Sequence, residues 1–464
     1  MVHFNYDIEP HHDIAFIDMK SFYGSVECIL RGLDPLRTSL CVMSQNANSQ
    51  GLILAASPVF KRIFGKSNVG HSMDLPFHPK TRKFNYKTAE RLGLPTDPSY
   101  IQFIEAWAQR TILAKPQMAQ YIAYNLKIQT IFSNYAAPED IWTYSIDEGF
   151  IDLTSTLNYW VPDKHLSRAE KLDIISCMIQ HDIYKETGIY STVGMSNSNP
   201  LLAKLALDNE AKHNVSMRAN WSYENIPEKV WEIPNLTDFW GIGSRTARHL
   251  QKIGIFTIKE LAHANPDILR KKLKSYGVQL WFHANGIDES DVHHVYRTKT
   301  HGMGSSKALP IAYSNLGAIQ LIYREKATEL AKQLFNTGKM ATTVSISIIY
   351  DKKEKKRSDH IQKHILATNR TQELVDVVLE LLQKKYQSGA VKKIVVRYSG
   401  LVSEGGYQLS LFEDSQKVER DFKLQTALQS IENQFGPLSL MRASNLRKES
   451  LVRWEKTLIG GHSA

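Results

Sequence analysis

The chain has 464 residues, of which 42% are hydrophobic and 10% are aromatic, and it carries a formal net charge of +10. That length predicts two to four domains of about 100 to 200 residues each. No apolar run approaches the roughly 18 residues of a membrane-spanning helix, and the polar N-terminal segment lacks the apolar core of a secretory signal. We therefore expect a soluble cytoplasmic protein with no membrane partner.

Residues that commonly form disulfides or zinc sites are sparse. The three cysteines, Cys28, Cys41 and Cys177, show no C-x-x-C spacing, which fits a reducing compartment and buried apolar thiols. Two adjacent histidine pairs, at 11–12 and 293–294, lack the i, i+4 spacing of a helical zinc site. The sequence therefore predicts neither a disulfide framework nor structural zinc.

The positive charge is concentrated in one part of the chain. Counting Lys and Arg against Asp and Glu gives −4 for residues 1–240, +14 for residues 241–400 and 0 for residues 401–464. Such a basic stretch is typical of a segment that grips a phosphate backbone. A solvated basic surface would give the same count, so charge alone leaves both interpretations open.

Residues 1–220 alternate between apolar runs of strand length and stretches with helical periodicity, which indicates an α/β or α+β unit. Residues 80–100 are polar, basic and broken by proline, so we expect a loop-rich insertion there. The expected strands are 13–18, 52–56, 142–146, 150–154 and 189–195, and the expected helices are 19–27, 60–64, 101–135, 165–187 and 199–212.

The second half of the chain has a different character. Beyond Trp231, short helices are expected around Gly241, Gly243 and Gly254, up to a linker rich in glycine and serine at residues 302–306. A separate α+β module should follow. Its expected elements are helices near 317–335 and 370–386, strands at 341–350 and 391–398, and a charged turn at 352–357.

Three acids stand where expected strands end. Asp18 closes the first strand, and the adjacent Asp147 and Glu148 lie between two strands. A lone Asp at a strand end is more commonly a turn former or a cap, and we interpret Asp140 and Asp152 in that way. Three carboxylates in one cleft, however, could bridge two divalent cations about 4 Å apart. Such a pair activates a hydroxyl and stabilises a leaving phosphate oxygen in an in-line displacement.

The sequence around these acids forms a two-part signature, IDMKSFYGSVE at 17–27 and YSIDEGFID at 144–152. In both motifs the chain resembles the Y-family DNA polymerases, most closely their UmuC-like bacterial branch, over about residues 13–412. The resemblance implies an α+β multidomain right-hand polymerase. Its expected domains are a palm at 1–30 and 101–230, fingers at 31–100, a thumb with a helix-hairpin-helix at 231–300, a separate α+β little finger at 307–405, and a clamp-binding peptide with a C-terminal tail at 406–464.

The resemblance also implies which residues carry the chemistry. Asp18, Asp147 and Glu148 would be the catalytic acids that hold two Mg²⁺ ions, for which Mn²⁺ can substitute, with the Met19 carbonyl as a further ligand. Tyr23, five residues after the first aspartate, would be the steric gate that stacks under the deoxyribose and excludes a 2′-hydroxyl. A flat, rigid ring suits that task, because it loses little entropy on ordering and leaves no room for an added oxygen.

Two basic positions, Arg62 and Lys212, match the family's contacts to the incoming triphosphate. Without the resemblance both would be interpreted as exposed helix charges. Together they would hold the β and γ phosphates while the primer 3′-hydroxyl attacks the α-phosphate. Four departures from the family pattern bear on how the nucleotide is held: Lys20, Val59, Gly149 and Asn199–Pro200.

Residues 236–247 resemble a helix-hairpin-helix, in which Gly241 and Gly243 let the turn pack closely and aim backbone N–H groups at a phosphate. The next helix and the basic third of the chain begin here, so we expect the thumb to bind DNA without regard to sequence. Its basic candidates are Arg245, Arg248 and Lys252. Further candidates in the little finger are Lys307, Lys339, Lys392, Lys393 and Arg397.

A short motif after Gly405 and Gly406 resembles the peptide by which bacterial polymerases bind the sliding clamp. A glutamine followed by apolar anchors is a pattern that a small groove can capture. The alternative is an edge strand with alternating leucines. The motif consists of Gln408, Leu409, Leu411 and Phe412 with the intervening serine.

The resemblance implies a template-directed DNA polymerase of the lesion-bypass type, acting in DNA repair, damage tolerance and the SOS response with low fidelity and no proofreading. Its expected partners are primer–template DNA, deoxynucleoside triphosphates and the sliding clamp, and a recombinase filament or accessory subunit is left open. We expect a monomer associated with the bacterial nucleoid. One alternative is a palm-fold nucleotidyl cyclase, which would not explain the hairpin. The other is a non-catalytic DNA-binding scaffold of the damage response, against which the three intact acids argue.

Overall fold

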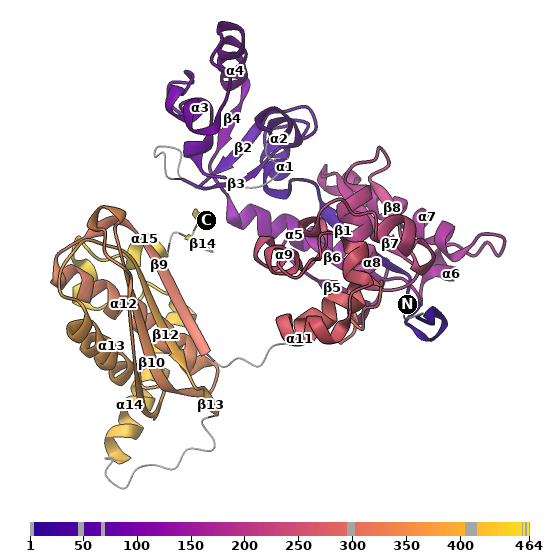
Figure 1. Cartoon of the computed structure of the whole chain (residues 1–464). Coiled ribbons are helices and arrows are strands. Elements are labelled where there is room, and N and C mark those ends of the chain that lie inside the picture. Colours follow the sequence, from indigo (N-terminus) through magenta and orange to yellow (C-terminus); the bar gives the residue numbers. More distant parts are fainter. Residues whose placement is uncertain are drawn as a thin grey trace. The chain divides into compact units, whose positions relative to one another are not determined.

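The computed structural model describes residues 4–44, 51–65, 70–294, 302–403, 415–456, 458–459 and 462–463. The chain forms two compact units, which are coloured along the sequence in Figure 1. The N-terminal unit comprises residues 1–296 with 462–464, and the C-terminal unit comprises residues 297–461. Among the described helices, none is long and apolar enough to cross a membrane.

A five-stranded sheet, in the order β5-β6-β1-β7-β8, forms the centre of the N-terminal unit. The middle strand β1 is antiparallel to both β6 and β7, whereas β7 and β8 are parallel. The strands are β1 (Ile14–Met19), β5 (Ile141–Thr143), β6 (Glu148–Asp152), β7 (Ser191–Ser196) and β8 (Arg218–Asn220). Four of the expected strands therefore lie in this sheet, whereas β8 was not expected and the expected strand at 52–56 belongs to the smaller sheet described below.

The two faces of this sheet are covered by different helices, because successive side chains of β1 point to opposite sides. Ala15, Ile17 and Met19 pack in one core, under α5, α6 and α7. Ile14 and Phe16 pack on the other face with residues of α8. The helices are α1 (Phe22–Ile29), α5 (Met118–Ser133), α6 (Leu157–Trp160), α7 (Arg168–Thr187) and α8 (Pro200–Ala206), which continues into the π-helical η4 (Leu207–Ala211).

A smaller sheet, in the order β3-β2-β4, belongs to a second core of this unit. The expected single helix over 101–135 is wrong, because β4 interrupts it and pairs in parallel with β2. Since Ile104 and Trp107 of α4 pack in the same core, the module extends past the expected fingers boundary at residue 100. Its elements are β2 (Leu40–Met43), β3 (Ile53–Ala56), α2 (Pro58–Phe64), α3 (Tyr86–Leu92), α4 (Pro98–Arg110) and β4 (Ile112–Ala114).

Short helices follow the central sheet and share a core with α8. They are η5 (Tyr223–Asn225), η6 (Ile226–Val230), η7 (Leu236–Asp238), α9 (Ser244–Gln251), α10 (Ile258–Ala262) and α11 (Pro266–Ala284). Single 3₁₀ turns elsewhere are η1 (Tyr6–Ile8), η2 (Ser72–Asp74), η3 (Pro138–Asp140), η8 (Lys352–Glu354) and η10 (Ala443–Leu446).

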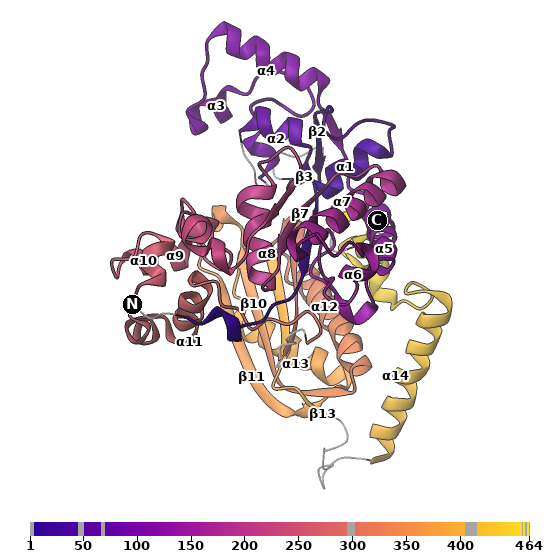
Figure 2. The same cartoon turned by 90° about the vertical axis from the view of Figure 1, so that its right-hand side faces the viewer.

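The C-terminal unit is built on a sheet in the order β11-β10-β12-β9 (Figure 2). Residues of this sheet pack with α12 and α13 in one hydrophobic core. The expected linker at 302–306 is wrong, because these residues begin β9 and pair with β12. The strand β11 was not expected. The elements are β9 (Gly302–Tyr313), α12 (Leu316–Asn336), β10 (Lys339–Tyr350), β11 (Asp359–Thr368), α13 (Thr371–Lys385), β12 (Val391–Ser399) and β13 (Val402–Ser403).

The described residues of the C-terminal tail are largely helical. Its elements are α14 (Ser415–Phe435), α15 (Val452–Glu455), β14 (Leu458–Ile459) and β15 (His462–Ser463).

Candidate active site

Two neighbouring strands bring the predicted acids together at one edge of the central sheet. Asp18, near the end of β1, lies directly opposite Glu148, the first residue of β6. The Met19 amide donates a hydrogen bond to the Asp147 carbonyl over 2.9 Å, so the segment before β6 is fixed to the end of β1. The side chains of Asp18 and Glu148 are only 15% and 20% exposed. Asp18, Met19, Asp147 and Glu148 therefore lie at one edge of the sheet.

Two lysines on one helix meet these acids. Lys204 Nζ lies 3.2 Å from Glu148 Oε1 and 3.3 Å from Asp208 Oδ2. Lys212 Nζ lies 2.8 Å from Asp208 Oδ1 and 3.4 Å from Asp18 Oδ2. Positive and negative groups therefore alternate from Glu148 through Lys204, Asp208 and Lys212 to Asp18. We call these five residues the charge ladder.

Close packing and helix geometry place both lysines over the strand ends. A Cβ atom on Gly194 of β7 would lie 2.0 Å from the Ala203 carbonyl oxygen, so only glycine lets α8 approach this strand so closely. The following π turn accommodates one more residue than an α turn. Because of that extra residue, Lys204 and Lys212, eight positions apart, project from the same face of the helix. A π turn of this kind is frequent at functional sites.

Because the acids are buried and lie close together, their charged forms are destabilised in the absence of a cation. Burial raises the pKa of Asp18 to about 6, and the neighbouring Glu148 and Asp147 add to the rise, while Lys212 opposes it. Burial also raises the pKa of Asp147. Burial lowers the pKa of Lys212, but the charges of Asp18 and Asp208 more than offset this and raise it overall. The site therefore has more negative charge than its buried environment solvates.

The donor set fits a hard divalent cation. Carboxylate oxygens are the ligands that Mg²⁺ prefers, and a cation would relieve the raised pKa values. Within the described residues, however, no three His, Cys, Asp or Glu side chains converge as a preformed metal site. Each acid instead has another partner: Glu148 pairs with Lys204, Asp18 pairs with Lys212, and Asp147 accepts a 2.8 Å hydrogen bond from Ser145.

The predicted steric gate lies beside the acids. Tyr23 is in the first turn of α1 and is half-buried. Burial, followed by the charge of Asp147, raises the pKa of Tyr23, so its hydroxyl lies within range of that charge. Its ring stacks on Tyr121 of α5 with centroids 4.3 Å apart.

The basic residues around the acids differ in part from those predicted. Arg62 is exposed on α2, whereas its neighbour Lys61 is partly buried and feels the charges of Asp18 and Asp147. Burial lowers the pKa of Lys61 and of Lys20, which also lies near Asp18. The sequence did not single out Lys61, because the match to the family pointed to the adjacent Arg62. The sequence did not single out Lys204 either, although the four-residue spacing of Lys204, Asp208 and Lys212 indicates that they share one face of a helix.

The predicted DNA contacts of the hairpin lie together on the surface. Gly241 has a φ of +94°, which only glycine adopts readily, and its carbonyl accepts a hydrogen bond from the Tyr276 hydroxyl. Gly243 caps the N-terminus of α9. The basic residues on and just after this helix are all exposed: Arg245, Arg248 and Lys252.

The little-finger candidates are less uniform. Lys307 lies 3.1 Å from Glu455 and over the ring of Trp454, so the tail already satisfies its charge. The Lys392 ammonium donates to the Leu309 carbonyl over 3.0 Å. Lys393 and Arg397 are exposed on β12, and Lys339, the first residue of β10, is half-buried. The clamp-motif residues Gln408, Leu409, Leu411 and Phe412 lie outside the described residues.

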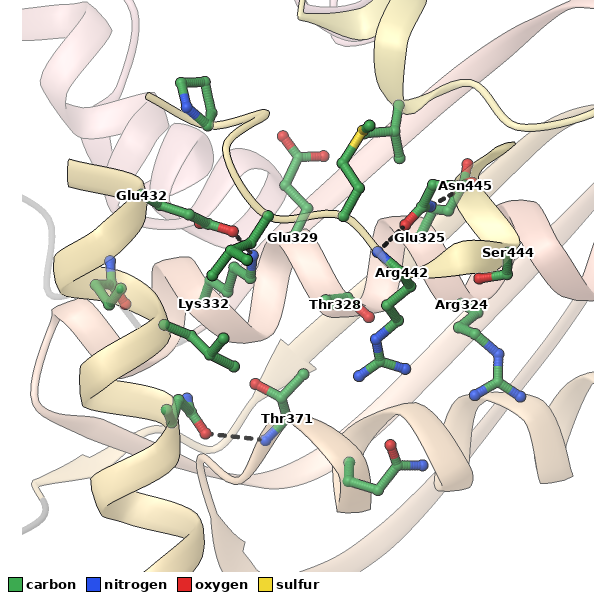
Figure 3. Close-up of a pocket in the computed structure, with 18 of the residues that line it drawn as sticks. Arg324, Glu325, Thr328, Glu329, Lys332, Thr371, Glu432, Arg442, Ser444 and Asn445 are labelled. Atoms are coloured by element: carbon green, nitrogen blue, oxygen red, sulfur yellow. Dashed lines mark hydrogen bonds and ion pairs between the residues drawn. The ribbon is translucent and has the colours of Figure 1, made fainter. Parts of the chain in front are cut away.

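A cavity of about 590 Å³ lies in the C-terminal unit, between α12, the start of α13, α14 and the segment before α15. Figure 3 shows Lys332 paired with Glu432 at one end and Asn445 bonded to Glu325 at the other, over 2.9 Å. These contacts attach α14 and the tail to α12. None of the predicted catalytic acids lines this cavity, so we place the chemistry in the N-terminal unit.

Comparison with known proteins adds three findings. The model of the impB/mucB/samB family matches residues 84–208, that of the family's C-terminal domain matches residues 300–411, and that of the IMS family HHH motif matches residues 223–255. A Bacillus subtilis protein named "Putative UV-damage repair protein UvrX" is 31% identical over 99% of this chain and 100% of its own length.

Other relatives are named as polymerases. DNA polymerase IV 2 of Bacillus subtilis is 28% identical, over 97% of this chain and 98% of its own length. Among solved structures, a Y-family DNA polymerase chimera matches with a TM-score of 0.58 and 18% identity, covering 84% of this chain and 99% of that chain. At that identity the structural likeness concerns the fold alone.

Proposed function

Because the chain belongs to the impB/mucB/samB family of Y-family DNA polymerases, we infer that it is a template-directed DNA polymerase of the lesion-bypass type. The predicted family and fold class, a right-hand α+β polymerase with a helix-hairpin-helix and a separate C-terminal sheet domain, are confirmed. A DNA polymerase acts on DNA and deoxynucleoside triphosphates, and this family implies dependence on a divalent metal. The cyclase and scaffold alternatives are set aside.

The proposed metal ligands are Asp18, Asp147 and Glu148, with the Met19 carbonyl, holding two Mg²⁺ ions. The observation that carries this proposal is the direct pairing of Asp18 with Glu148 across β1 and β6. When bound, two metal ions activate the primer 3′-hydroxyl and stabilise the leaving phosphate oxygen. The chain's own part is to hold the three carboxylates at one buried sheet edge, where their raised pKa values favour a cation.

The triphosphate is proposed to bind beside the ladder lysines. The Lys212 side chain is 36% exposed and its Nζ lies only 3.4 Å from Asp18 Oδ2, so it can meet a phosphate at the acidic edge. Lys61 joins the predicted Arg62 and Lys212 as a proposed phosphate contact, since it is partly buried within range of the charges of Asp18 and Asp147, which raise its pKa against the effect of burial. Tyr23, in the first turn of the helix that follows β1, is proposed to lie under the sugar as the steric gate.

The remaining assignments concern DNA and the clamp. The exposed Arg245, Arg248 and Lys252, with the glycine turn before them, are proposed to hold the phosphate backbone of any template sequence. The motif at 408–412 is proposed to bind the sliding clamp. A monomeric state, a recombinase or accessory partner and association with the nucleoid stay predictions from the sequence.

Primer extension on plain and lesion-containing templates tests the proposal. We expect the wild type to extend a primer past a lesion with Mg²⁺ or Mn²⁺. Asp147→Ala combined with Glu148→Ala should lower the extension rate at least about 1,000-fold, because removing the acids removes the charge that holds the cations.

The matched control is a double change of two exposed acids of the same unit, Glu186→Ala with Glu228→Ala, which should extend primers like the wild type. Extension that survives in the Asp147 and Glu148 variant would contradict the metal assignment. A wild type that extends no primer with either metal would contradict the polymerase assignment itself.

A further inference from the structure

The ring of Tyr23 rests on a second aromatic ring. It stacks on Tyr121 with centroids 4.3 Å apart and with ring planes 14° from parallel. Tyr121 is fully buried, whereas Tyr23 is half-buried and lies within range of the charge of Asp147, which raises its pKa. Because the interior is close-packed, Tyr23 cannot tilt or sink unless Tyr121 moves as well.

A buried carboxylate fixes Tyr121 in turn. The Tyr121 hydroxyl donates a 2.7 Å hydrogen bond to Glu27 Oε1, and the Glu27 side chain has no exposed surface. Gln117 donates to both oxygens of Glu27 over 3.2 Å, and Arg31 forms an ion pair with it. A buried carboxylate is destabilising unless it is paired and hydrogen-bonded, and here every partner is provided.

The contacts return to the helix that carries Tyr23. Tyr23, Glu27 and Arg31 are four residues apart on α1 or directly after it, and therefore lie on one face. Tyr121 and Gln117 come from the start of α5. Burial and the Glu27 hydrogen bond raise the pKa of Tyr121, so its hydroxyl stays a hydrogen-bond donor at any working pH. An apolar side chain would fill this space without desolvating a charge, so the charged network is best explained by a need for fixed geometry.

We propose that Tyr121, held by Glu27, is a positioning residue that determines sugar specificity: it fixes the Tyr23 ring where a 2′-hydroxyl would clash. This inference rests on the proposed function, in which Tyr23 is the steric gate. Excluding one oxygen depends on a displacement of about 1 Å. A smaller side chain at position 121 lets Tyr23 sink by that much and admits ribonucleotides. Tyr121 itself is fully buried and acts through Tyr23.

Single-nucleotide insertion kinetics test this proposal. The readout is the kcat/KM for a ribonucleotide divided by the kcat/KM for the matching deoxynucleotide. We expect Tyr121→Leu to raise this ratio about tenfold or more, because the supporting ring is gone. Tyr121→Phe keeps the ring and loses only the hydrogen bond to Glu27, so it should raise the ratio about two- to fivefold. If the leucine variant does not fold, the phenylalanine variant decides the test.

The chain offers a closely matched control. Tyr135, just after α5, is also buried, donates a 2.6 Å hydrogen bond to Asp182 and packs on Trp160 with ring centroids 4.7 Å apart. A tyrosine that only stabilises the core affects both rates alike. Tyr135→Leu should therefore leave the ratio unchanged even where it lowers both rates.

The outcomes separate this inference from the gate assignment. If Tyr23→Ala raises the ratio but both Tyr121 variants match the wild type, the inference is overturned and the gate stands. If Tyr23→Ala leaves the ratio unchanged, the gate and the inference fail together. Adding Tyr121→Leu to Tyr23→Ala should give no further rise. A further rise as large as in the wild-type background would mean that Tyr121 acts by another route, and would overturn the inference.

Discussion

At the scale of single residues, the site buries charged groups, and burial destabilises them unless a ligand of opposite charge binds. Asp18 has a pKa of about 6, against 3.8 for an ordinary aspartate, mainly because it is buried. Its native state therefore binds a proton more tightly than its unfolded state does, and stability falls as pH rises between these two values. Function is thus expected to oppose stability at this position.

We predict that Asp18→Asn abolishes primer extension and yet stabilises the metal-free protein at pH 8 by about 2 to 3 kcal/mol. The amide has a similar shape and no charge to desolvate, and the size follows from the pKa shift at about 1.4 kcal/mol per unit. Urea unfolding without divalent ions measures the effect, which should shrink as pH falls from 6 toward 4. The exposed Asp163→Asn serves as the control. An asparagine variant less stable than the wild type at pH 8 would refute this account.

At the scale of elements, one contact aligns the helix of the charge ladder with the sheet. Gly194 faces the backbone of α8, with the Ala203 oxygen 2.0 Å and the Leu207 amide nitrogen 2.5 Å from where a Cβ would be. Backbone atoms cannot move aside as a flexible side chain can. A methyl group here must push the helix off β7, and the ladder lysines with it.

We predict that Gly194→Ala destabilises the N-terminal unit by about 3 kcal/mol or more and lowers activity even where the protein is folded, because Lys204 and Lys212 no longer reach the acids. Thermal unfolding and extension assays at low temperature measure the two effects. Gly304→Ala is the matched strand control, because the nearest atoms to its added Cβ lie at an ordinary 3.5 Å. Equal behaviour of the two variants would contradict the packing argument.

The sequence predicted the strands that end at the candidate catalytic acids better than the strands that only complete a sheet. The strand before Asp18 and the pair Asp147–Glu148 were found because apolar runs ending in acids are distinctive. The strand β4 was missed, since three residues between two helices carry no period of their own. β11 was missed because its burial is partial and most of its residues are polar.

Only those site residues that lie within a sequence motif could be predicted. Lys204 and Lys61 escaped because their roles depend on which strand ends face them, which is set by sheet order and helix packing. The support of Tyr23 by Tyr121 joins residues 98 positions apart on two helices. No local pattern encodes such a contact.

At the scale of the whole molecule, the chain divides its tasks between two units. The acids, the ladder lysines, Tyr23 and the hairpin all belong to the N-terminal unit, residues 1–296 with 462–464. The basic third of the chain, residues 241–400, spans the hairpin and the sheet of the C-terminal unit. Residues 291–294 are the last described residues of the N-terminal unit before the boundary. Their contacts with the rest of this unit therefore fix where the chain leaves the unit.

A histidine makes this attachment. His293 Nε2 lies 2.7 Å from Asp140 and its Nδ1 lies 2.7 Å from Asp291, which also binds His294. The other titratable groups that face it are Asp152, whose charge it feels, and His12, whose ring centroid is 6.4 Å away. The hydrogen bonds to Asp291 and Asp140 raise the pKa of His293. Burial raises the pKa of Asp291, but its hydrogen bonds from the two histidines lower it overall to about 2.

We predict that His293→Gln destabilises the N-terminal unit by about 1 kcal/mol at pH 6 and by little at pH 9. A histidine whose folded pKa is raised contributes its full stabilisation below its unfolded pKa of about 6.5 and loses it as pH rises through the folded value. Seven of the eight tryptophans lie in this unit, so urea unfolding followed by tryptophan fluorescence reports on it. His181→Gln, at an exposed position of α7, should have no such pH dependence. A destabilisation equal at both pH values would show that His293 acts by packing rather than by its charge.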